Sequence, residues 1–299
     1  MTGYASGKTT SSVSHRFITP ASWVGAGGFA LVFLTIFFVL PVATLITLGF
    51  IDDGALDLSG FAHVFTRPRT WRIIGLTVGQ AAAGTIISVI LGIPGAYVLY
   101  RRTFPGQGLV RALVTIPFVL PTVVVGVAFR ALLAESGPLG FLNLDGTVTA
   151  VIIALVFFNY ALVVRGVGNM WERLDPRTEE AAAALGAKPA HVFWRITLPA
   201  LAPAIASAAS LVFLFSATAF GVVLVLGGPR VGTVETEIWT LTTQFLDLRS
   251  AAVLSIVQLV IVSGVLLAAN RARNKREVAL RMNATTTTRK PLNVRSDAL

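Results

Sequence analysis

The sequence of 299 residues contains no cysteine, so a disulfide, a thiolate nucleophile and a cysteine-ligated metal are all excluded. Only 13% of the residues are charged, about half the fraction that a soluble domain of this length carries. In contrast, 55% of the residues are hydrophobic. The composition therefore predicts an integral membrane protein.

The sequence also lacks the residues that several other activities of membrane proteins require. The chain has only three histidines, and His63 and His191 lie far apart without a carboxylate cluster, so neither a metal site nor an integral-membrane enzyme is indicated. Few ionisable residues fall inside the apolar runs, which argues against a proton relay or a voltage sensor. No charged ring or carbonyl-filter motif suggests a channel.

Residues 1–22 are polar and rich in Ser, Thr and Gly, and we expect them to be disordered and cytoplasmic. Gly3, Gly7, Lys8 and Thr9 partly match a phosphate-binding loop. However, the gap between the glycines is one residue short and no buried strand precedes it. The chain is therefore not expected to bind ATP itself.

Six apolar runs are each long enough to cross a bilayer, which takes about 20 helical residues, and too long for barrel strands. We expect Gly92, Pro94 and Gly95 to bend the second run. The runs cover residues 24–50, 73–100, 109–133, 147–167, 200–226 and 251–269. They predict an all-α, six-helix membrane domain over residues 23–270, followed by a basic cytoplasmic tail at 271–299.

The distribution of positive charge predicts the orientation. With the N-terminus inside, the inner segments hold 18 of the 24 Lys and Arg residues and the outer segments hold 6. By the positive-inside rule both termini are cytoplasmic, and so is the loop between the fourth and fifth runs. The net charge of +10 is thus explained by topology and lipid contact, and nucleic-acid binding is not expected.

The loop at residues 172–199 is a polar island that predicts two short helices. Asp175 supplies an N-cap acceptor and Pro176 suits the first helical position. Gly186 is a natural C-cap, because glycine adopts the left-handed conformation at the lowest cost. Pro189 can begin a second helix, which we expect to end near Pro199.

The spacing within this loop resembles the EAA signature of ABC importer permeases, the membrane subunits of binding-protein-dependent importers. The matching residues are Glu180, Ala181, Ala182, Gly186 and, after nine further residues, Ile196, Leu198 and Pro199. The resemblance implies the type I importer fold, in which two permease subunits surround a central path. Each subunit rests its EAA loop in a groove of an ATPase subunit.

The resemblance also implies roles within the loop. Glu180 would pair with a basic group of the ATPase, and the small side chains of Ala181 and Ala182 would permit close approach. Gly186 would form the turn. The residues expected to pack the loop onto the bundle are Ile196, Leu198 and Pro199.

The partners follow from the same resemblance. The chain would need a cytosolic ATPase dimer carrying ATP and magnesium, an extracytoplasmic solute-binding protein and a second permease subunit, identical or different. It would hold no cofactor and would not be an enzyme by itself. We expect it to be a multi-pass protein of the bacterial inner membrane.

Two segments suggest a substrate. GGPRVGTVETEIWTLTTQFLDLRSAAVLSIVQLV and PFVLPTVVVGVAFRALL look like permeases of the thiamine and ferric-iron importers. Thiamine is therefore the expected solute, with ferric iron as the alternative, and molybdate, sulfate, phosphonate or polyamine stay open. Such permeases are often fused tandems of two six-helix halves, whereas this chain has one half.

Uncharged polar residues inside the runs could line the pathway or bond neighbouring helices. They are Asn159, Ser216 and Thr218, which we place first, and Gln80, Thr122 and Gln258. On the outer side, Gly227-Gly228-Pro229 should break the fifth helix, and residues 231–244 could form a short amphipathic helix. Arg230, Glu235 and Glu237 there are candidates for docking the binding protein, although a solvated helix anchored by Trp239 is the simpler interpretation.

Overall fold

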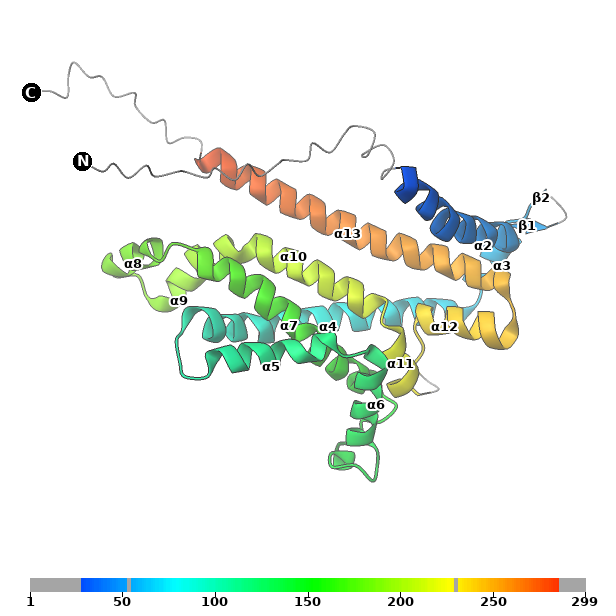
Figure 1. Cartoon of the computed structure of the whole chain (residues 1–299), viewed down its shortest axis with the longest axis horizontal. Helices are drawn as coiled ribbons and strands as arrows, with labels where there is room; N and C mark the ends of the chain where they lie inside the picture. Colours follow the sequence, from blue (N-terminus) through cyan, green and yellow to red (C-terminus); the bar gives the residue numbers. More distant parts are fainter. Residues whose placement is uncertain (1–27, 53–54, 229–230, 285–299) are drawn as a thin grey trace, which may run out of the picture.

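The computed structural model describes residues 28–52, 55–228 and 231–284, and these residues are almost entirely helical (Figure 1). The label η marks π or 3-10 turns. The elements are η1 (Thr35–Val39), α2 (Leu40–Phe50), β1 (Ile51–Asp52), β2 (Ala55–Leu56), α3 (Ser59–Phe65), α4 (Pro68–Arg101), α5 (Gln107–Val119), α6 (Thr122–Leu133), η2 (Gly140–Leu142), α7 (Val148–Arg173), α8 (Arg177–Ala184), α9 (Pro189–Val192), η3 (Phe193–Thr197), α10 (Leu198–Ala217), α11 (Phe220–Leu226), α12 (Val234–Thr240), η4 (Leu241–Phe245) and α13 (Leu248–Ala284). The predicted disordered segment 1–22, Arg230 and the end of the basic tail lie outside the described residues.

Four helices of the described chain are long and apolar enough to cross a membrane, namely Pro68–Arg101, Val148–Arg173, Pro189–Ala217 and Leu248–Ala268. A fifth span results if α5 and α6 are taken together, although they are bent by 101° where Pro121 interrupts the helix. The first apolar run contributes the shorter helix Gly28–Thr44. The protein is therefore an all-α membrane protein with four to five candidate spans, and the sixth span stays a prediction.

The centre of the bundle is the packing of α4 along α7 and α10. α4 is one continuous helix through Gly92, Pro94 and Gly95, where the sequence predicts a bend. The two glycines face α7, and a Cβ placed on Gly92 would lie 2.5 Å from Cγ1 of Val163. Glycine thus permits a close approach that any side chain would prevent.

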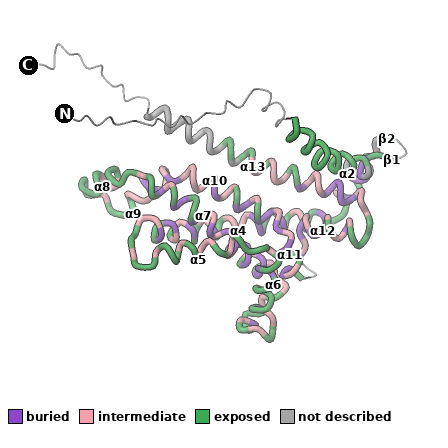
Figure 2. The backbone as a smooth tube through the Cα atoms, in the orientation of Figure 1, coloured by how far each residue is buried: buried purple, intermediate pink, exposed green. Residues whose placement is uncertain are grey.

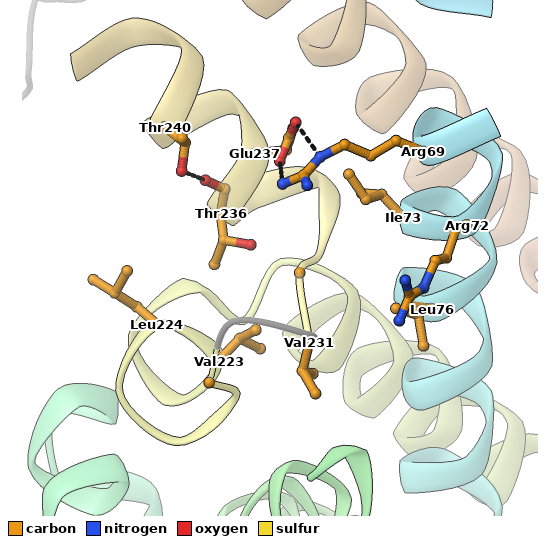
Figure 3. A pocket seen from close by; sticks show the side chains of 12 residues that line it. Arg69, Arg72, Ile73, Leu76, Val223, Leu224, Val231, Thr236, Glu237 and Thr240 are labelled. Carbon is orange, nitrogen blue, oxygen red and sulfur yellow. Dashed lines mark hydrogen bonds and ion pairs between the residues drawn. The ribbon is translucent and has the colours of Figure 1, made fainter. Parts of the chain in front are cut away.

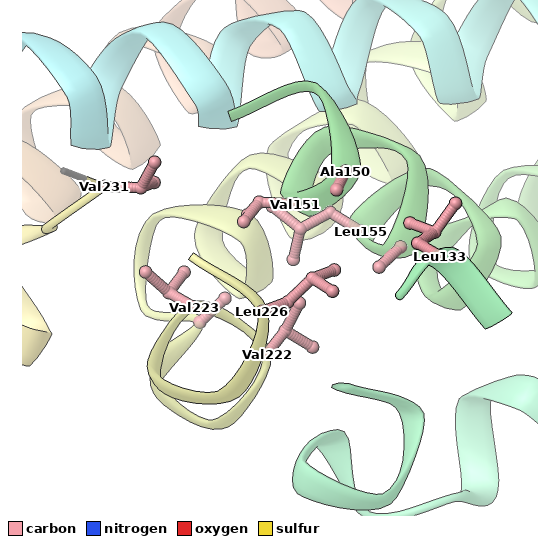
Figure 4. Close-up of a cluster of buried hydrophobic side chains, with 10 residues drawn as sticks. Leu133, Ala150, Val151, Leu155, Val222, Val223, Leu226 and Val231 are labelled. Carbon is pink, nitrogen blue, oxygen red and sulfur yellow. The ribbon is translucent and has the colours of Figure 1, made fainter. Parts of the chain in front are cut away.

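A second apolar cluster joins α7 to α6 and α11 (Figure 4). Val151 and Leu155 of α7 lie against Val222 and Leu226 of α11, and all four side chains are almost fully buried. Leu133 at the end of α6 completes the cluster. The short helix α11 is therefore held by packing on α6 and α7 rather than by its own length.

The fifth apolar run is broken, which the sequence did not predict. α10 ends at Ala217 and α11 begins at Phe220, with Ala219 in an extended conformation between them. The break leaves the carbonyl of Ala217 without its helical donor, and the Gln258 side chain of α13 donates to it at 3.0 Å. A side-chain donor from the neighbouring helix therefore makes the interruption tolerable inside the bundle.

The prediction that the second helix of the loop ends near Pro199 was wrong. α9, η3 and α10 form one helix from Pro189 to Ala217. At its π turn the Leu198 N–H donates to the Phe193 carbonyl, five residues back. This wider turn directly precedes Pro199 and leaves room for a ring that would clash with the preceding turn of a regular α-helix.

The two ends of the bundle are distinct in Figure 1. The loop carrying α8 and α9 and the end of α13 lie at one end, whereas α11, α12 and the β1–β2 hairpin lie at the other. The predicted orientation, with loop and tail in the cytoplasm, stays a prediction. The side chains of η1 and the first half of α2 are exposed, whereas α2 contacts α13 and its last residue, Phe50, stacks on Phe61 of α3 (Figure 2).

We predict opposite effects for two glycine substitutions on α4. Gly92→Ala places a methyl against the buried, stiff Val163, so it should destabilise the protein by about 1–3 kcal/mol. Gly79→Ala, where nothing lies within 4 Å, should stabilise the helix by up to about 1 kcal/mol. Thermal unfolding in detergent measures both, and an equal response of the two variants would contradict the proposed close packing.

Candidate functional site

The candidate coupling site is the loop at residues 172–199, which we call the coupling loop. Its first helix, α8, begins at Arg177 with Pro176 as the N-cap, one residue later than predicted, and Oδ1 of Asp175 accepts a hydrogen bond from the Arg177 N–H at 3.0 Å. Glu179 and Glu180 stand in the first turn, where carboxylates interact favourably with the helix dipole. The helix start is therefore stabilised in part by local interactions.

The turn after α8 is also as predicted. Gly186 has φ of +84°, in the left-handed region that favours glycine. The Ala187 N–H donates to the Ala182 carbonyl at 3.0 Å, and the Gly186 N–H donates to the Ala183 carbonyl at 2.9 Å. These two bonds form a complete Schellman motif, which fixes the angle between α8 and the next helix.

Glu179 attaches the coupling loop to the bundle. One carboxylate oxygen accepts from Nη2 of Arg101, at the end of α4, at 2.9 Å, and the other accepts from Oγ1 of Thr197 at 2.8 Å. Sequence reasoning missed this residue and singled out its neighbour Glu180, because the composition of the loop does not show which side of α8 faces the bundle. The Glu180 side chain is exposed, so it is available to a partner.

The free face of α8 is small and apolar. Ala181 and Ala184 are exposed, and the side chain of Leu185, which directly follows the helix, is 89% exposed. Ala182 is half-buried. Of the residues expected to pack the loop onto the bundle, Ile196 and Leu198 are half-buried and Pro199 is exposed. The roles assigned to these residues stay predictions.

A row of three aromatic rings connects α4 and α7 to the coupling loop. The rings of Tyr97 on α4 and Trp171 on α7 lie 5.4 Å apart, and Trp171 lies 6.2 Å from Phe193 of η3. Beside them is an apolar pocket of about 560 Å³ between α4, α7 and the coupling loop. The loop therefore contacts the bundle through an ion pair at Glu179 and through aromatic packing.

The candidate pathway residues are mostly buried within this one subunit. Nδ2 of Asn159 donates to Oγ of Ser216 at 3.2 Å, which joins α7 to α10. Gln80 of α4 is also buried, and its amide atoms have no partner among the described residues. Thr122 and Thr218 are half-buried, Thr122 against α11 and Thr218 at the break after α10. Their role in a pathway stays a prediction.

The other end of the bundle holds a pocket of about 270 Å³ between the start of α4, the end of α11 and α12, which we call the distal pocket (Figure 3). The guanidinium of Arg69 forms a bidentate pair with Glu237, with Nε to Oε1 at 2.9 Å and Nη2 to Oε2 at 2.8 Å. Arg72 projects from the next turn of α4 (Figure 3). The predicted short helix in this segment is therefore confirmed as α12, and it is bound to α4.

The three candidate docking residues lie in different surroundings. Glu237 is held by Arg69, and its side chain is only 15% exposed. Glu235 faces α13, where burial raises the pKa of its carboxyl and a hydrogen bond from Gln258 at 3.4 Å partly offsets this. Arg230 lies outside the described residues. Within the described chain no three His, Asp or Glu side chains group as metal ligands.

Comparison with known proteins identifies the class to which this arrangement belongs. Residues 84–276 match the family described as "Binding-protein-dependent transport system inner membrane component". The match covers more than half of the chain and includes the whole coupling loop. The protein belongs to this family: it is a multi-pass permease subunit of the inner membrane and is not itself an enzyme.

Two groups of named relatives are similar over most of the chain. The sulfate transport system permease protein CysT of Escherichia coli K12 is 30% identical over 223 residues, which are 73% of this chain and 79% of that protein. The molybdenum transport system permease protein ModB of Mycobacterium tuberculosis is 32% identical over 224 residues, 73% of this chain and 85% of that protein. Sulfate and molybdate are among the solutes that the sequence left open, whereas neither relative is named for thiamine, the expected solute, or for ferric iron.

Solved structures agree on the fold. A bacterial ABC transporter that imports the polysaccharide alginate superposes with a TM-score of 0.71 at 18% identity, over 85% of this chain and 96% of that chain. The methionine transporter MetNI, in an inward-facing conformation, superposes with a TM-score of 0.57 at 18% identity, over 70% and 98%. The ABC importer permease fold is therefore confirmed.

We predict that the Arg101–Glu179 pair holds α8 in place. Because the chain has no cysteine, a Leu185→Cys variant accepts a single spin label on the exposed face of α8. Glu179→Gln or Arg101→Gln should weaken the attachment by about 1–3 kcal/mol and increase the mobility of the label, measured by electron paramagnetic resonance. Glu172→Gln is the matched control, because its exposed carboxylate lies 3.7 Å from Arg111. Equal spectra for all variants would rule out this anchor.

Proposed function

We propose that this chain is the permease subunit of an ATP-driven, binding-protein-dependent importer for a tetrahedral oxyanion, sulfate or molybdate. The observation that carries the proposal is the similarity over about three quarters of the chain to permeases named for those two solutes. Thiamine and ferric iron rest only on short likenesses near the third and last apolar runs. The oxyanion therefore replaces thiamine as the proposed substrate.

The partners proposed are a cytosolic ATPase dimer, an extracytoplasmic binding protein and a second permease subunit. The family description supports dependence on a binding protein. The exposed alanines and Leu185 of α8 suit contact with an ATPase surface, and Glu180 is placed to meet a basic group there. ATP and magnesium would be bound by the ATPase.

The proposed mechanism uses the coupling loop as a lever. ATP-driven closure of the ATPases displaces α8, and the Schellman turn at Gly186 keeps α8 at a fixed angle to the helix that follows. The Glu179–Arg101 pair passes the displacement to α4. The path then alternates between inward-open and outward-open states, whose relative stability ATP changes.

The decisive experiment is uptake by the importer reconstituted in proteoliposomes with its ATPase, second permease and binding protein. We expect ATP-driven uptake of radiolabelled sulfate or molybdate but not of thiamine. Gly186→Val should abolish uptake while the protein stays in the membrane, because a β-branched residue is strained at φ of +84°. Gly186→Asn should retain most uptake, since asparagine tolerates this conformation. A binding protein that selects thiamine would overturn the oxyanion assignment.

The proposed orientation places the coupling loop in the cytoplasm. A single cysteine at position 185, introduced as Leu185→Cys, should then react with a membrane-impermeant maleimide in inverted membrane vesicles. It should stay unlabelled in spheroplasts, whose outer membrane is removed and whose inner membrane is intact. Cysteine at the exposed Phe141, in the α6–α7 connection, should show the opposite pattern. The reverse result at both positions would mean that the charge bias gives the wrong orientation.

A further inference from the structure

Two arginines of the distal pocket stand at the start of α4, where positive charge is unfavourable for the helix. Arg69 and Arg72 stand in the first turns of α4, where the helix dipole is positive, and the first turn of α4 contains no acidic residue. Acidic residues are favoured at such positions and basic ones are not. Placing two arginines here therefore weakens the helix start unless an anion compensates them.

Glu237 of α12 compensates Arg69. It forms two parallel hydrogen bonds with the Arg69 guanidinium, and Figure 3 shows the pair at the edge of the hollow. The same guanidinium fork fits two oxygens of a tetrahedral oxyanion as well as it fits a carboxylate. A doubly charged oxyanion is therefore a natural competitor of Glu237 for Arg69.

The pocket has room for such a competitor. Its volume of about 270 Å³ is several times the roughly 30 Å³ that a water molecule occupies in the liquid, so a small oxyanion fits with part of its hydration shell. Gly228 and Gly232 form part of the wall, and Gly228 has φ of +61°. A Cβ on Gly228 would lie 3.1 Å from the Cα of Gly146, so glycine here lets the end of α11 approach the start of the α7 segment closely.

The two threonine side chains of the wall are already hydrogen-bonded. Oγ1 of Thr236 donates to the Thr233 carbonyl at 3.0 Å, and Oγ1 of Thr240 donates to the Thr236 carbonyl at 2.9 Å. Recognition would thus depend on charge from the arginines rather than on a full set of hydrogen bonds. Such a site binds weakly and releases its ligand readily, as a site for passage requires.

The pocket does not depend on the Arg69–Glu237 pair for its shape. The backbone N–H of Val234, at the start of α12, donates to Oγ1 of Thr77 on α4 at 2.9 Å in a buried contact. This bond and the apolar packing of Val234 keep α12 on α4 when Glu237 is displaced. Exchange of one anion for another on Arg69 is therefore possible without unfolding the pocket.

We propose that the distal pocket is a transit site for a tetrahedral dianion, which Arg69 and Arg72 bind as Glu237 is displaced from Arg69. The proposal rests on the proposed function, because it takes the solute to be sulfate or molybdate and this end of the bundle to face the binding protein. Beyond the proposed function, it makes the distal pocket the first site in the permease that the solute contacts.

The test compares four variants of the reconstituted importer at saturating, sulfate-loaded binding protein. Arg69→Gln and Arg72→Gln should each lower sulfate uptake about fivefold or more, as expected for loss of a charge-assisted hydrogen bond. Arg67→Gln is the matched control, because it removes the same charge at the same helix end, where Arg67 bonds His63 outside the pocket. The control should transport sulfate normally.

Glu237→Gln separates a transit site from a purely structural ion pair. If Glu237 competes with the anion, its neutralisation should keep or raise uptake and should tighten equilibrium binding of radiolabelled sulfate to the importer without binding protein. If the pair only holds α12 to α4, Glu237→Gln should lose activity together with Arg69→Gln, and the proposal is overturned.

Oxyanion import and the transit site can be overturned separately. If the unmodified importer takes up no oxyanion and its binding protein binds none, the proposed function fails and the transit site fails with it. If the unmodified importer transports sulfate but Arg69→Gln and Arg72→Gln match the Arg67→Gln control, only the transit site is overturned.

Discussion

The close approach of α4 to α7 is the contact on which the rest of the bundle depends. Glycine at positions 92 and 95 lets the two helices meet at a distance that Val163 and Tyr160 would otherwise prevent. Because α4 is continuous, this contact fixes both of its ends at once. One end holds α12 through Arg69, and the other holds α8 through Arg101. A single helix thereby connects the coupling loop to the distal pocket.

Those parts of the structure that local chemistry determines could be predicted from the sequence. Asp175 bonds the first N–H of α8 and Gly186 forms the turn after it, since each depends only on its neighbours in the chain. The break at Thr218 could not be predicted, because it depends on a donor from Gln258, which is distant in sequence. The choice of Glu179 over Glu180 as the anchor likewise depends on where α4 ends.

The same distinction applies to the substrate. The motif of the coupling loop concerns contact with the ATPase and not with the solute. It therefore identifies the class of transporter but not its substrate. Two short segments gave a likeness to thiamine and iron permeases, whereas similarity over about three quarters of the chain leads to sulfate and molybdate permeases. A resemblance over so few residues carries less information about the substrate than one that extends over most of the chain.

The length of α4 has a consequence for its two terminal ion pairs. A helix of 34 residues is about 50 Å long, whereas the hydrocarbon core of a bilayer is about 30 Å thick. Even when tilted, α4 extends into the headgroup regions at both faces, so Arg69 and Arg101 lie where water and mobile ions reach them. The Debye length is about 10 Å at 0.1 M salt, and mobile ions weaken an exposed ion pair more than a buried one. The Arg69 side chain is 68% exposed and the Arg101 side chain 18%, so ionic strength affects the attachment of α12 to this helix more than that of α8.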